Sequence, residues 1–335
     1  MVANDGLECD QTIRVGFLLI DGFGMMGTTA AIDPLYMANQ VTGQNLYDWI
    51  PITADGDPTP ASNGLILMPA ASIDEIDTLP YVFVCASYGC ETFEDKRVFS
   101  WLRQLHRHGA TIGSLALGSY VLARAGLLKD HRCTIHWQTQ AAFGEDFPAL
   151  DVTSRLFEVD RRIMTSAGGS ATFDMMLHLI AQHHGQDLAV AVAEQMIHPL
   201  PDAADPQQRM PLTQRLRISH PKLIHVIELM EANLEEPLRR EDLAERVGLS
   251  TRQVERLFET YLGRTPARYY LELRLKRAHL LLCQTSLPVL DVSIACGFIS
   301  ASHFSKSYRD FFGHSPRDER APQNQRVPTP NAINS

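Results

Sequence analysis

Two stretches of the sequence, STRQVERLFETYLGRTP (250–266) and SASHFSKSYRDFFGHSP (300–316), align at a constant offset of 50 residues. Each is preceded by a short helical pattern that ends at a glycine, Gly248 or Gly297. The sequence therefore predicts a helix, a glycine-containing turn and a second helix, twice over. The matched pairs are Val254 with Phe304, Arg256 with Lys306, Phe258 with Tyr308, Gly263 with Gly313, Thr265 with Ser315 and Pro266 with Pro316.

The second helix of such a unit enters the DNA major groove, which is wide enough for one helix. Exposed polar and basic residues at its start can then meet base edges and phosphates, and the helix-capping serines leave N–H groups for phosphate. A helix over residues 267–282 would join the two units rigidly. The candidate DNA-binding residues are Ser250, Thr251, Arg252, Gln253 and Arg256 in the first copy, and Ser300, Ser302, His303, Lys306 and Arg309 in the second.

The charge distribution supports a separate DNA-binding part. The whole chain has a net charge of −9, which by itself argues against nucleic acid. Residues 215–320, however, hold 17 Lys and Arg against 14 Asp and Glu, a net charge of +3, whereas residues 1–214 hold 12 against 25, a net charge of −13. An acidic body with a mildly basic carboxyl-terminal region indicates two parts with different partners.

Residues of about 220–320 resemble the AraC/XylS transcription-factor domain, and ACGFISASHFSKSYRDFFGHSPRDER (295–320) carries the resemblance almost throughout. It implies two helix-turn-helix units joined by a long helix and reading two adjacent major-groove segments. The family's base-reading positions fall on residues 251–253 and 301–303. Arg256, Lys306 and Arg309 are then suited to phosphate.

The first part of the chain alternates between strand and helix patterns. Nearly continuous apolar runs predict buried strands, and helical patterns follow them, so we expect an α/β domain with a largely parallel sheet. The first helix is expected to be capped by Thr28 or Thr29. The expected strands are 13–20, 79–87, 110–118, 154–159 and 162–166, and the expected helices are 28–40, 93–109, 119–128, 168–185 and 187–198.

Domain boundaries follow from composition. Residues 199–219 are rich in Pro, Asp and Gln without periodicity, which is typical of a linker. We therefore expect an α/β ligand-sensing domain at 11–198, the linker at 199–219, an all-α domain at 220–320 and a disordered tail at 321–335.

The segment GSLALGSYVLARAGLL (113–128) predicts a strand, a sharp turn and a helix. With HRCTIHWQT (131–139) and DGFGMMG (21–27), it resembles the flavodoxin-like DJ-1/PfpI group, also called class I glutamine amidotransferase-like. Enzymes of that group carry a cysteine at this elbow, with a histidine and an acidic group nearby. Here the elbow residue is Ala116, and Gly27 stands where the acidic partner often is, so we expect no catalysis and no catalytic residue.

An elbow without a nucleophile can still form a ligand pocket. Together with IDPLYMAN (32–39) and MEANLEEP (230–237), the two domains resemble regulators of glycine betaine, carnitine, sarcosine or arginine catabolism. This implies a small amine-bearing metabolite as inducer, which aromatic faces and carboxylates could bind. The candidate ligand-binding residues are Phe23, Asp33, Tyr88, Ala116, Leu117, His136 and Trp137, with Trp137 the strongest single candidate.

Other classes of protein fit less well. The six cysteines form no CxxC pair, so neither a zinc site, another metal nor a disulfide framework is indicated, and no cofactor is expected. No apolar run suggests a membrane span or a signal peptide, and a reducing cytoplasm fits best. The expected partners are double-stranded DNA, the inducer, a second copy in a homodimer and, as a further candidate, RNA polymerase. Two alternatives stay open: a DJ-1/PfpI-type enzyme with an appended DNA-binding module, and a ligand-independent DNA-binding protein.

Overall fold

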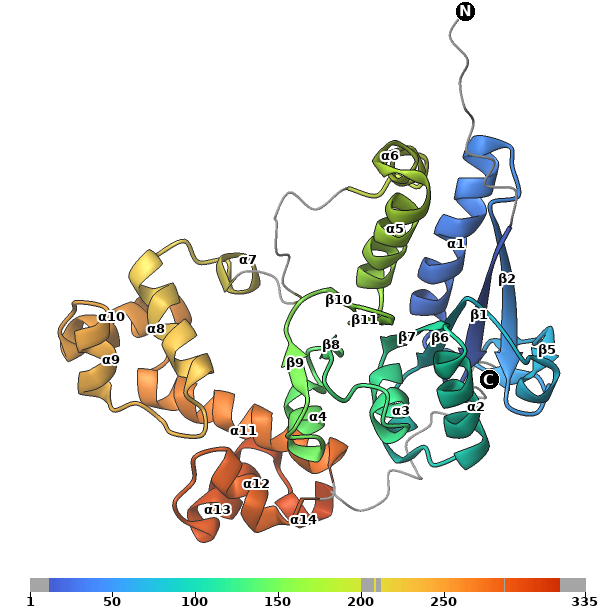
Figure 1. Cartoon of the computed structure of the whole chain (residues 1–335). Helices are drawn as coiled ribbons and strands as arrows, with labels where there is room; N and C mark the ends of the chain where they lie inside the picture. The colour runs from blue at the N-terminus through green and yellow to red at the C-terminus, as the bar shows by residue number, and fades with distance from the viewer. Residues whose placement is uncertain (1–11, 200–207, 209–211, 286, 320–335) are drawn as a thin grey trace, which may run out of the picture. The chain divides into compact units, whose positions relative to one another are not determined.

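The computed structural model describes residues 12–199, 208, 212–285 and 287–319. It divides into two compact units, Met1–Arg209 and Met210–Ser335, labelled by element in Figure 1. No helix among the described residues has the length and apolar character that a bilayer span requires.

A seven-stranded sheet forms the centre of the first unit, in the order β10-β11-β7-β6-β1-β2-β5. All neighbouring strands are parallel except β10 and β11, which pair antiparallel at one edge. Two small pairs, β3–β4 and β8–β9, lie outside this sheet. The strands are β1 (Ile13–Leu19), β2 (Tyr47–Thr53), β3 (Thr59–Pro60), β4 (Ile66–Leu67), β5 (Ala71–Ser72), β6 (Tyr81–Ala86), β7 (Thr111–Ala116), β8 (Arg132–Thr134), β9 (Asp151–Thr153), β10 (Phe157–Asp160) and β11 (Ile163–Ser166).

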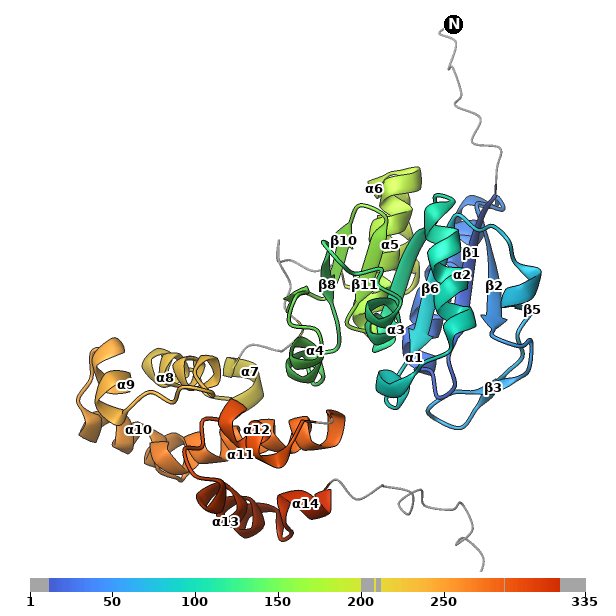
Figure 2. The ribbon, with the colours of Figure 1, turned by 60° about the horizontal axis from the view of Figure 1, so that its bottom comes forward.

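Both faces of the sheet are buried because the strand residues alternate between two apolar cores. Phe17 and Phe83 point into the core formed with α1, α5 and α6, whereas Leu18 and Val84 point into the core formed with α2 and α3. Figure 1 shows α1 beside α5, and Figure 2 shows α2 in front of the strands. The helices are α1 (Met25–Thr42), α2 (Lys96–Arg107), α3 (Gly118–Arg124), α4 (Gln140–Asp146), α5 (Ser170–His184) and α6 (Gln186–Gln195).

The α/β architecture is as the sequence predicts, but the start of α1 is not. The helix begins at Met25 with Gly24 as its N-cap, and Gly24 offers no side-chain cap. Thr28 and Thr29 lie inside the helix, where their hydroxyls donate to the backbone oxygens of Gly24 and Met25, each at 3.1 Å. The expectation of a threonine cap was wrong because a threonine hydroxyl can also be satisfied by the preceding helical turn.

The second unit is helical throughout its described part. Its two helix-turn-helix pairs are α9 with α10 and α12 with α13, joined by the long helix α11, as the repeat predicts. Helix α8 packs on the first pair and α11 on the second. The helices are α7 (Leu212–Leu216), α8 (Pro221–Ala232), α9 (Arg240–Arg246), α10 (Thr251–Leu262), α11 (Pro266–Gln284), α12 (Val289–Ala295), α13 (Ala301–Phe312) and α14 (Pro316–Glu319).

The segment expected as a linker, 199–219, contains more structure than its composition suggests. Helix α7 falls within it, and Leu212 and Ile218 are buried in the core of the second unit. Gln208, near the end of the first unit, is hydrogen-bonded within that unit: its amide nitrogen donates to Thr134 Oγ1 at 2.9 Å and to the Ile135 carbonyl at 2.9 Å. Residues 200–207 and 209–211, and the predicted tail at 321–335, lie outside the described residues.

Candidate functional site

The carboxyl ends of β1, β6, β7 and β11 meet at one edge of the sheet because these neighbouring strands are parallel. Ligands of open α/β sheets bind at this edge. The loops that follow these strands carry Phe23, Tyr88 and Gly168, and Ala116 is the last residue of β7. The ligand site predicted from the sequence is therefore expected at this edge.

Ala116 forms the tip of a sharp strand-to-helix elbow. Its φ angle is 52°, in the left-handed region that costs a residue with a Cβ roughly 1–2 kcal/mol. Two glycines make room for this turn. A Cβ on Gly118, at the start of α3, would lie 2.4 Å from the Val84 carbonyl oxygen, and one on Gly168, in the loop after β11, would lie 2.5 Å from the Ala116 Cβ. The elbow geometry is thus retained, but its tip carries a methyl group and no nucleophilic atom.

The nearby cysteines do not replace the missing nucleophile. Cys85, Cys90 and Cys133 are all buried. Burial raises the pKa of the Cys85 and Cys133 thiols to about 12, and it also raises the pKa of Cys90. The Cys90 thiol donates to the carbonyl of Leu117, 3.3 Å away, directly beside the elbow. These side chains are neutral thiols, and the thiolate is the nucleophilic form.

Three of the predicted ligand residues come together around one glutamine. Tyr88, in the loop after β6, donates from its hydroxyl to Gln138 Oε1 at 2.5 Å. The Gln138 backbone N–H donates in turn to His136 Nδ1 at 3.4 Å, and the His136 and Trp137 rings lie 5.7 Å apart. Burial lowers the pKa of His136, which favours a neutral imidazole. Tyr88 is 56% exposed and Trp137 39% exposed, so both can meet a ligand.

Other predicted ligand residues do not join this group. Phe23 is fully buried in the core under α1, and Leu117 is buried in the opposite core. Their side chains stabilise the fold and cannot line an open pocket in this conformation. Asp33 is exposed on α1, where partial burial raises the pKa of its carboxyl, and no hydrogen bond within the described residues links it to the other candidates.

The two recognition helices, α10 and α13, begin at equivalent serines. Ser250 Oγ accepts from the backbone N–H of Gln253 at 3.3 Å, and Ser300 Oγ accepts from that of His303 at 3.4 Å. Gly248 and Gly297 have φ angles of 64° and 71°, as the turns require. Buried Phe258 and Tyr308 fix the inner faces. Each helix therefore presents its predicted polar residues on the outside.

Four of the predicted DNA-binding residues are cations that take no part in the ion pairs of the second unit. Within the described parts of the chain, Arg252, Arg256, Lys306 and Arg309 form no ion pair. Other arginines of the unit do: Arg268 Nε lies 3.2 Å from a Glu272 carboxylate oxygen. All four predicted cations are exposed. An exposed cation that is not held in an ion pair is suited to a phosphate or a base edge.

The two copies differ at their third helical residue. Gln253 Oε1 accepts from the backbone N–H of Ser250 at 2.8 Å and from its hydroxyl at 3.0 Å, which completes a capping box. A glutamine that reads adenine uses both its oxygen and its nitrogen. Gln253 must therefore give up its cap to read a base in this way, whereas His303 at the matching place is exposed and caps nothing with its side chain.

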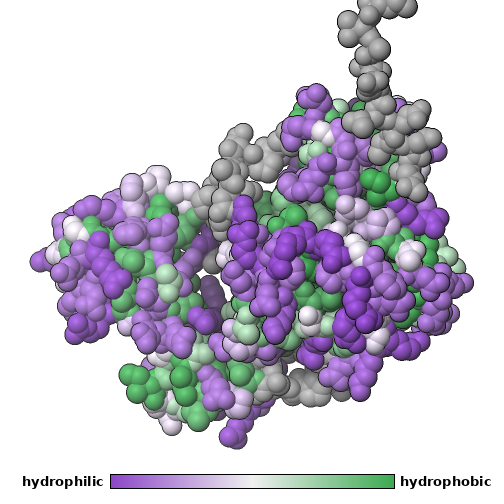
Figure 3. Space-filling model, in the orientation of Figure 1, coloured by the Kyte–Doolittle hydropathy of each residue, from purple (hydrophilic) through white to green (hydrophobic). Residues whose placement is uncertain are grey.

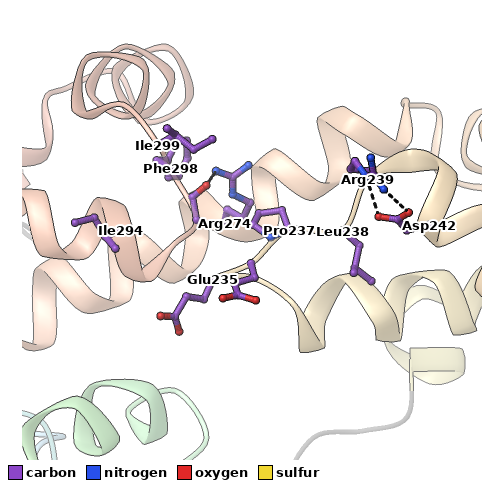
Figure 4. A pocket seen from close by; sticks show the side chains of 11 residues that line it. Glu235, Pro237, Leu238, Arg239, Asp242, Arg274, Ile294, Phe298 and Ile299 are labelled. Atoms are coloured by element: carbon purple, nitrogen blue, oxygen red, sulfur yellow. Dashed lines mark hydrogen bonds and ion pairs between the residues drawn. The ribbon is translucent and has the colours of Figure 1, made fainter.

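Sequence reasoning missed the residues that hold the two turns. Lys222 Nζ on α8 donates to the Gly248 carbonyl at 3.1 Å. Arg274 on α11 donates to the carbonyls of Cys296 at 2.8 Å and Gly297 at 2.7 Å, and Figure 4 shows it beside Phe298 and Pro237. The sequence did contain a signal for these contacts, because a basic residue lies about 25 positions before each turn glycine.

A second polar cluster joins α11 to the end of the chain's described part. His279, Cys283 and Glu319 bring three side chains of metal-binding type together. The Glu319 carboxylate, however, already accepts from the Tyr308 hydroxyl at 3.0 Å, and that hydroxyl lies 3.0 Å from His279 Nδ1. Burial and the neighbouring Glu319 raise the pKa of Cys283 to about 11, which disfavours the thiolate that binds metal. We interpret the cluster as a hydrogen-bond network that holds α14.

Comparison with known proteins matches both units. Residues 14–182 match the model of the DJ-1/PfpI family, and residues 243–321 match that of a helix-turn-helix domain. The chain is 44% identical over 309 residues to the HTH-type transcriptional regulator GbdR of Pseudomonas aeruginosa, covering 92% of this chain and 84% of that protein. It is 45% identical over 305 residues to the regulator CdhR of the same species, covering 91% of this chain and 90% of that protein.

A crystal structure of an AraC family transcriptional regulator from Pseudomonas putida matches 55% of this chain and 99% of its own, with 29% identity and a TM-score of 0.52. That these relatives are named as transcriptional regulators supports a non-enzymatic role.

Proposed function

The chain belongs to the transcriptional regulators that join a DJ-1/PfpI domain to an AraC-type helix-turn-helix domain, and we propose that it activates genes of amine or amino-acid catabolism in response to a metabolite. The inducer class is a small amine-bearing molecule such as glycine betaine, carnitine or arginine. The observation that supports this proposal is the elbow at Ala116, which has a positive φ angle and closely packed glycines but no nucleophile.

Double-stranded DNA is the partner of the second unit. The proposed recognition helices are α10 and α13, the second helices of the two helix-turn-helix pairs. The proposed base-reading residues lie at 251–253 and 301–303, with Arg252 and His303 the main candidates. The proposed phosphate contacts are Arg256, Lys306 and Arg309. Support comes from the exposure of these side chains and from the lack of an ion pair at the four cations.

The proposed ligand site is the group formed by Tyr88, His136 and Trp137. A quaternary or protonated amine is attracted to the faces of Trp and Tyr rings. Both rings are partly exposed, and the hydrogen bond from Tyr88 to Gln138 joins the two loops that carry them. A bound ligand would therefore order two loops that one hydrogen bond already links.

Gln208 offers a route from this site toward the second unit. Its amide donates to the Ile135 carbonyl, one residue before His136, and also to the Arg155 carbonyl at 3.0 Å. In the chain it precedes α7 by only a few residues. A ligand that moves the 136–138 loop would change the contacts of Gln208 and so the connection to the DNA-binding unit. The regulator is further proposed to act as a homodimer and to contact RNA polymerase.

A thermal-shift screen against glycine betaine, carnitine, sarcosine, dimethylglycine, choline and arginine tests the ligand site. Ligand bound to the folded state raises stability by RT ln(1 + [L]/Kd). Trp137→Ala changes the proposed site. Trp49→Ala is the matched control, in strand β2 of the same unit, away from that site. A selective shift that Trp137→Ala abolishes and Trp49→Ala retains would support the site.

Two outcomes would contradict parts of the proposal. No shift with any of these amines, in a protein that binds DNA, would remove the ligand class and favour a ligand-independent regulator. A shift that survives Trp137→Ala and His136→Ala would move the site away from this loop.

A further inference from the structure

The turn of the second helix-turn-helix is one residue longer than that of the first. The backbone bonds that close the first turn run from Gly248 N to Glu245 O and from Leu249 N to Ala244 O. The same two bonds recur 49 residues later, from Gly297 N to Ile294 O and from Phe298 N to Ser293 O. The capping serines Ser250 and Ser300, by contrast, are 50 residues apart. The additional residue is Ile299.

Ile299 is the residue of this turn that points away from the protein. Leu249 and Phe298 occupy equivalent places in the two turns, because their backbone N–H groups make the equivalent bonds. Both pack inward: Leu249 is half-buried and Phe298 is 3% exposed. Ile299 is 106% exposed, the largest exposed fraction of any large apolar side chain among the described residues. In Figure 3, apolar surface gathers where this unit carries α12 and α13. The insertion thus places an isoleucine on the outside, directly before the recognition helix.

The backbone on both sides of Ile299 is fixed. The Arg274 guanidinium lies 4.1 Å from the centroid of the Phe298 ring and donates to the carbonyl of Gly297. Ser300, on the other side, caps α13. Figure 4 shows Arg274, Phe298 and Ile299 at the head of this helix. An isolated exposed isoleucine is ordinary on a protein surface. Ile299, however, lies directly before the N-cap of a recognition helix, between two residues whose positions are fixed, so its own backbone position is fixed too.

The chemistry of the major groove supplies one apolar target at this place. Thymine exposes its C5-methyl group there, whereas the other groups on the base edges are mainly hydrogen-bond donors and acceptors. Ile299 has neither a donor nor an acceptor. The exposed residues that follow it in the sequence, Ser302, His303 and Lys306, carry polar and basic groups. We propose that Ile299 reads the methyl group of one thymine in the half-site bound by the second recognition helix, an inference that rests on the proposed DNA-binding function.

A hollow on the other side of Ile299 suits DNA less well. This cavity of about 770 Å³ is lined by Ile294, Phe298 and Ile299 and also by Glu235 and Glu236. Asp242 lines it too, and these three carboxylates outnumber the guanidiniums of Arg239 and Arg274 that also line it. The net negative charge would repel phosphate, so DNA is expected on the side of Ser302 and Lys306. Binding of a protein partner in the hollow is the competing outcome, and it predicts that Ile294 and Ile299 act together.

The test uses a duplex that the full-length protein selects from a random-sequence pool. Each thymine of the selected site is replaced in turn by deoxyuridine, which removes only the methyl group, and the affinity is measured. One replacement is expected to weaken wild-type binding about fourfold, as for one methyl group lost from an apolar contact. Ile299→Ala should bind the thymine and deoxyuridine duplexes equally at that position. Ile294→Ala is the matched control, an exposed isoleucine on α12, and should behave as wild type.

The outcomes separate this inference from the function on which it rests. If the wild-type protein selects no sequence, the proposed DNA-binding function fails. If it selects a site but Ile299→Ala keeps every deoxyuridine effect of the wild type, Ile299 reads no methyl group and the inference is overturned. Loss of the same effect in Ile294→Ala would also overturn it, because the two isoleucines would then act through the hollow.

Discussion

The guanidinium of Arg274 lies 4.1 Å from the centre of the Phe298 ring and donates to the carbonyls of Cys296 and Gly297. It thereby ties the joining helix α11 to the turn of the second helix-turn-helix. Gly297 must be glycine here, because a Cβ would lie 2.7 Å from the backbone oxygens of Leu234 and Glu235. The turn is thus held between α11 and the 234–237 loop.

We expect Arg274→Ala to destabilise the second unit by about 2–4 kcal/mol, because two carbonyls lose charged hydrogen bonds and the Phe298 ring loses its cation. Arg268→Ala is the control. It breaks an exposed ion pair with Glu272 and should cost less than about 1 kcal/mol. Urea unfolding followed by far-UV circular dichroism measures both. Equal losses in the two variants would show that Arg274 does not hold the turn.

Ala116→Gly is expected to raise the stability of the first unit by about 1 kcal/mol, because glycine relieves the positive φ angle at the elbow. Ala123→Gly, within α3, should lower it by about 1 kcal/mol as an ordinary helical substitution. All three tryptophans lie in this unit, so unfolding followed by tryptophan fluorescence reports on it alone. A loss of stability in Ala116→Gly would mean that the elbow is not strained.

DNA-binding variants should separate into two kinds of effect. Lys306→Ala should weaken binding to all sequences and reduce the salt dependence by about one charge. His303→Ala should lose preference at particular base pairs, by roughly 1–3 kcal/mol. Titrations of selected and unrelated duplexes at several salt concentrations measure both effects. A change of sequence preference alone in Lys306→Ala would reverse the assigned roles.

His183 should make the first unit less stable in acid. Its two ring nitrogens lie 3.0 Å from the Tyr47 hydroxyl and 2.7 Å from the Tyr81 hydroxyl. Burial, with His184 nearby, lowers its pKa from 6.5 to about 4. The unfolded chain therefore binds the proton more readily, and this part of the stability, complete above pH 6.5, is lost as the pH falls toward 4. His183→Gln should show a shallower decline of the melting temperature over this range, and an identical pH profile would contradict the assignment.

Sequence patterns predicted most of the fold because they report burial. The apolar run at 13–20 and the repeat at 250 and 300 correspond to β1 and to the two recognition helices. No strand was expected over 43–78, where β2 contains Pro51 and is only partly buried. For the ligand site, the sequence suggested aromatics in segments expected near the elbow. It could not show that Phe23 points into the core, because that depends on packing across the sheet.

The inserted residue of the second turn illustrates the same limit. The offset of 50 residues is constant from Ser250 onward, but the glycines before it, Gly248 and Gly297, are 49 apart. A difference of one residue is visible in the sequence. Its consequence, that Ile299 points outward, depends on which backbone bonds the turn keeps.

The anchors Lys222 and Arg274 define the boundaries of a minimal fragment. Each lies on the helix that precedes its helix-turn-helix, α8 or α11, so the duplicated element is a set of three helices. A truncated protein that begins at Arg239 would contain both helix-turn-helix pairs but would leave the Gly248 carbonyl without its donor. An autonomous DNA-binding fragment must therefore begin at or before Pro221, the first residue of α8.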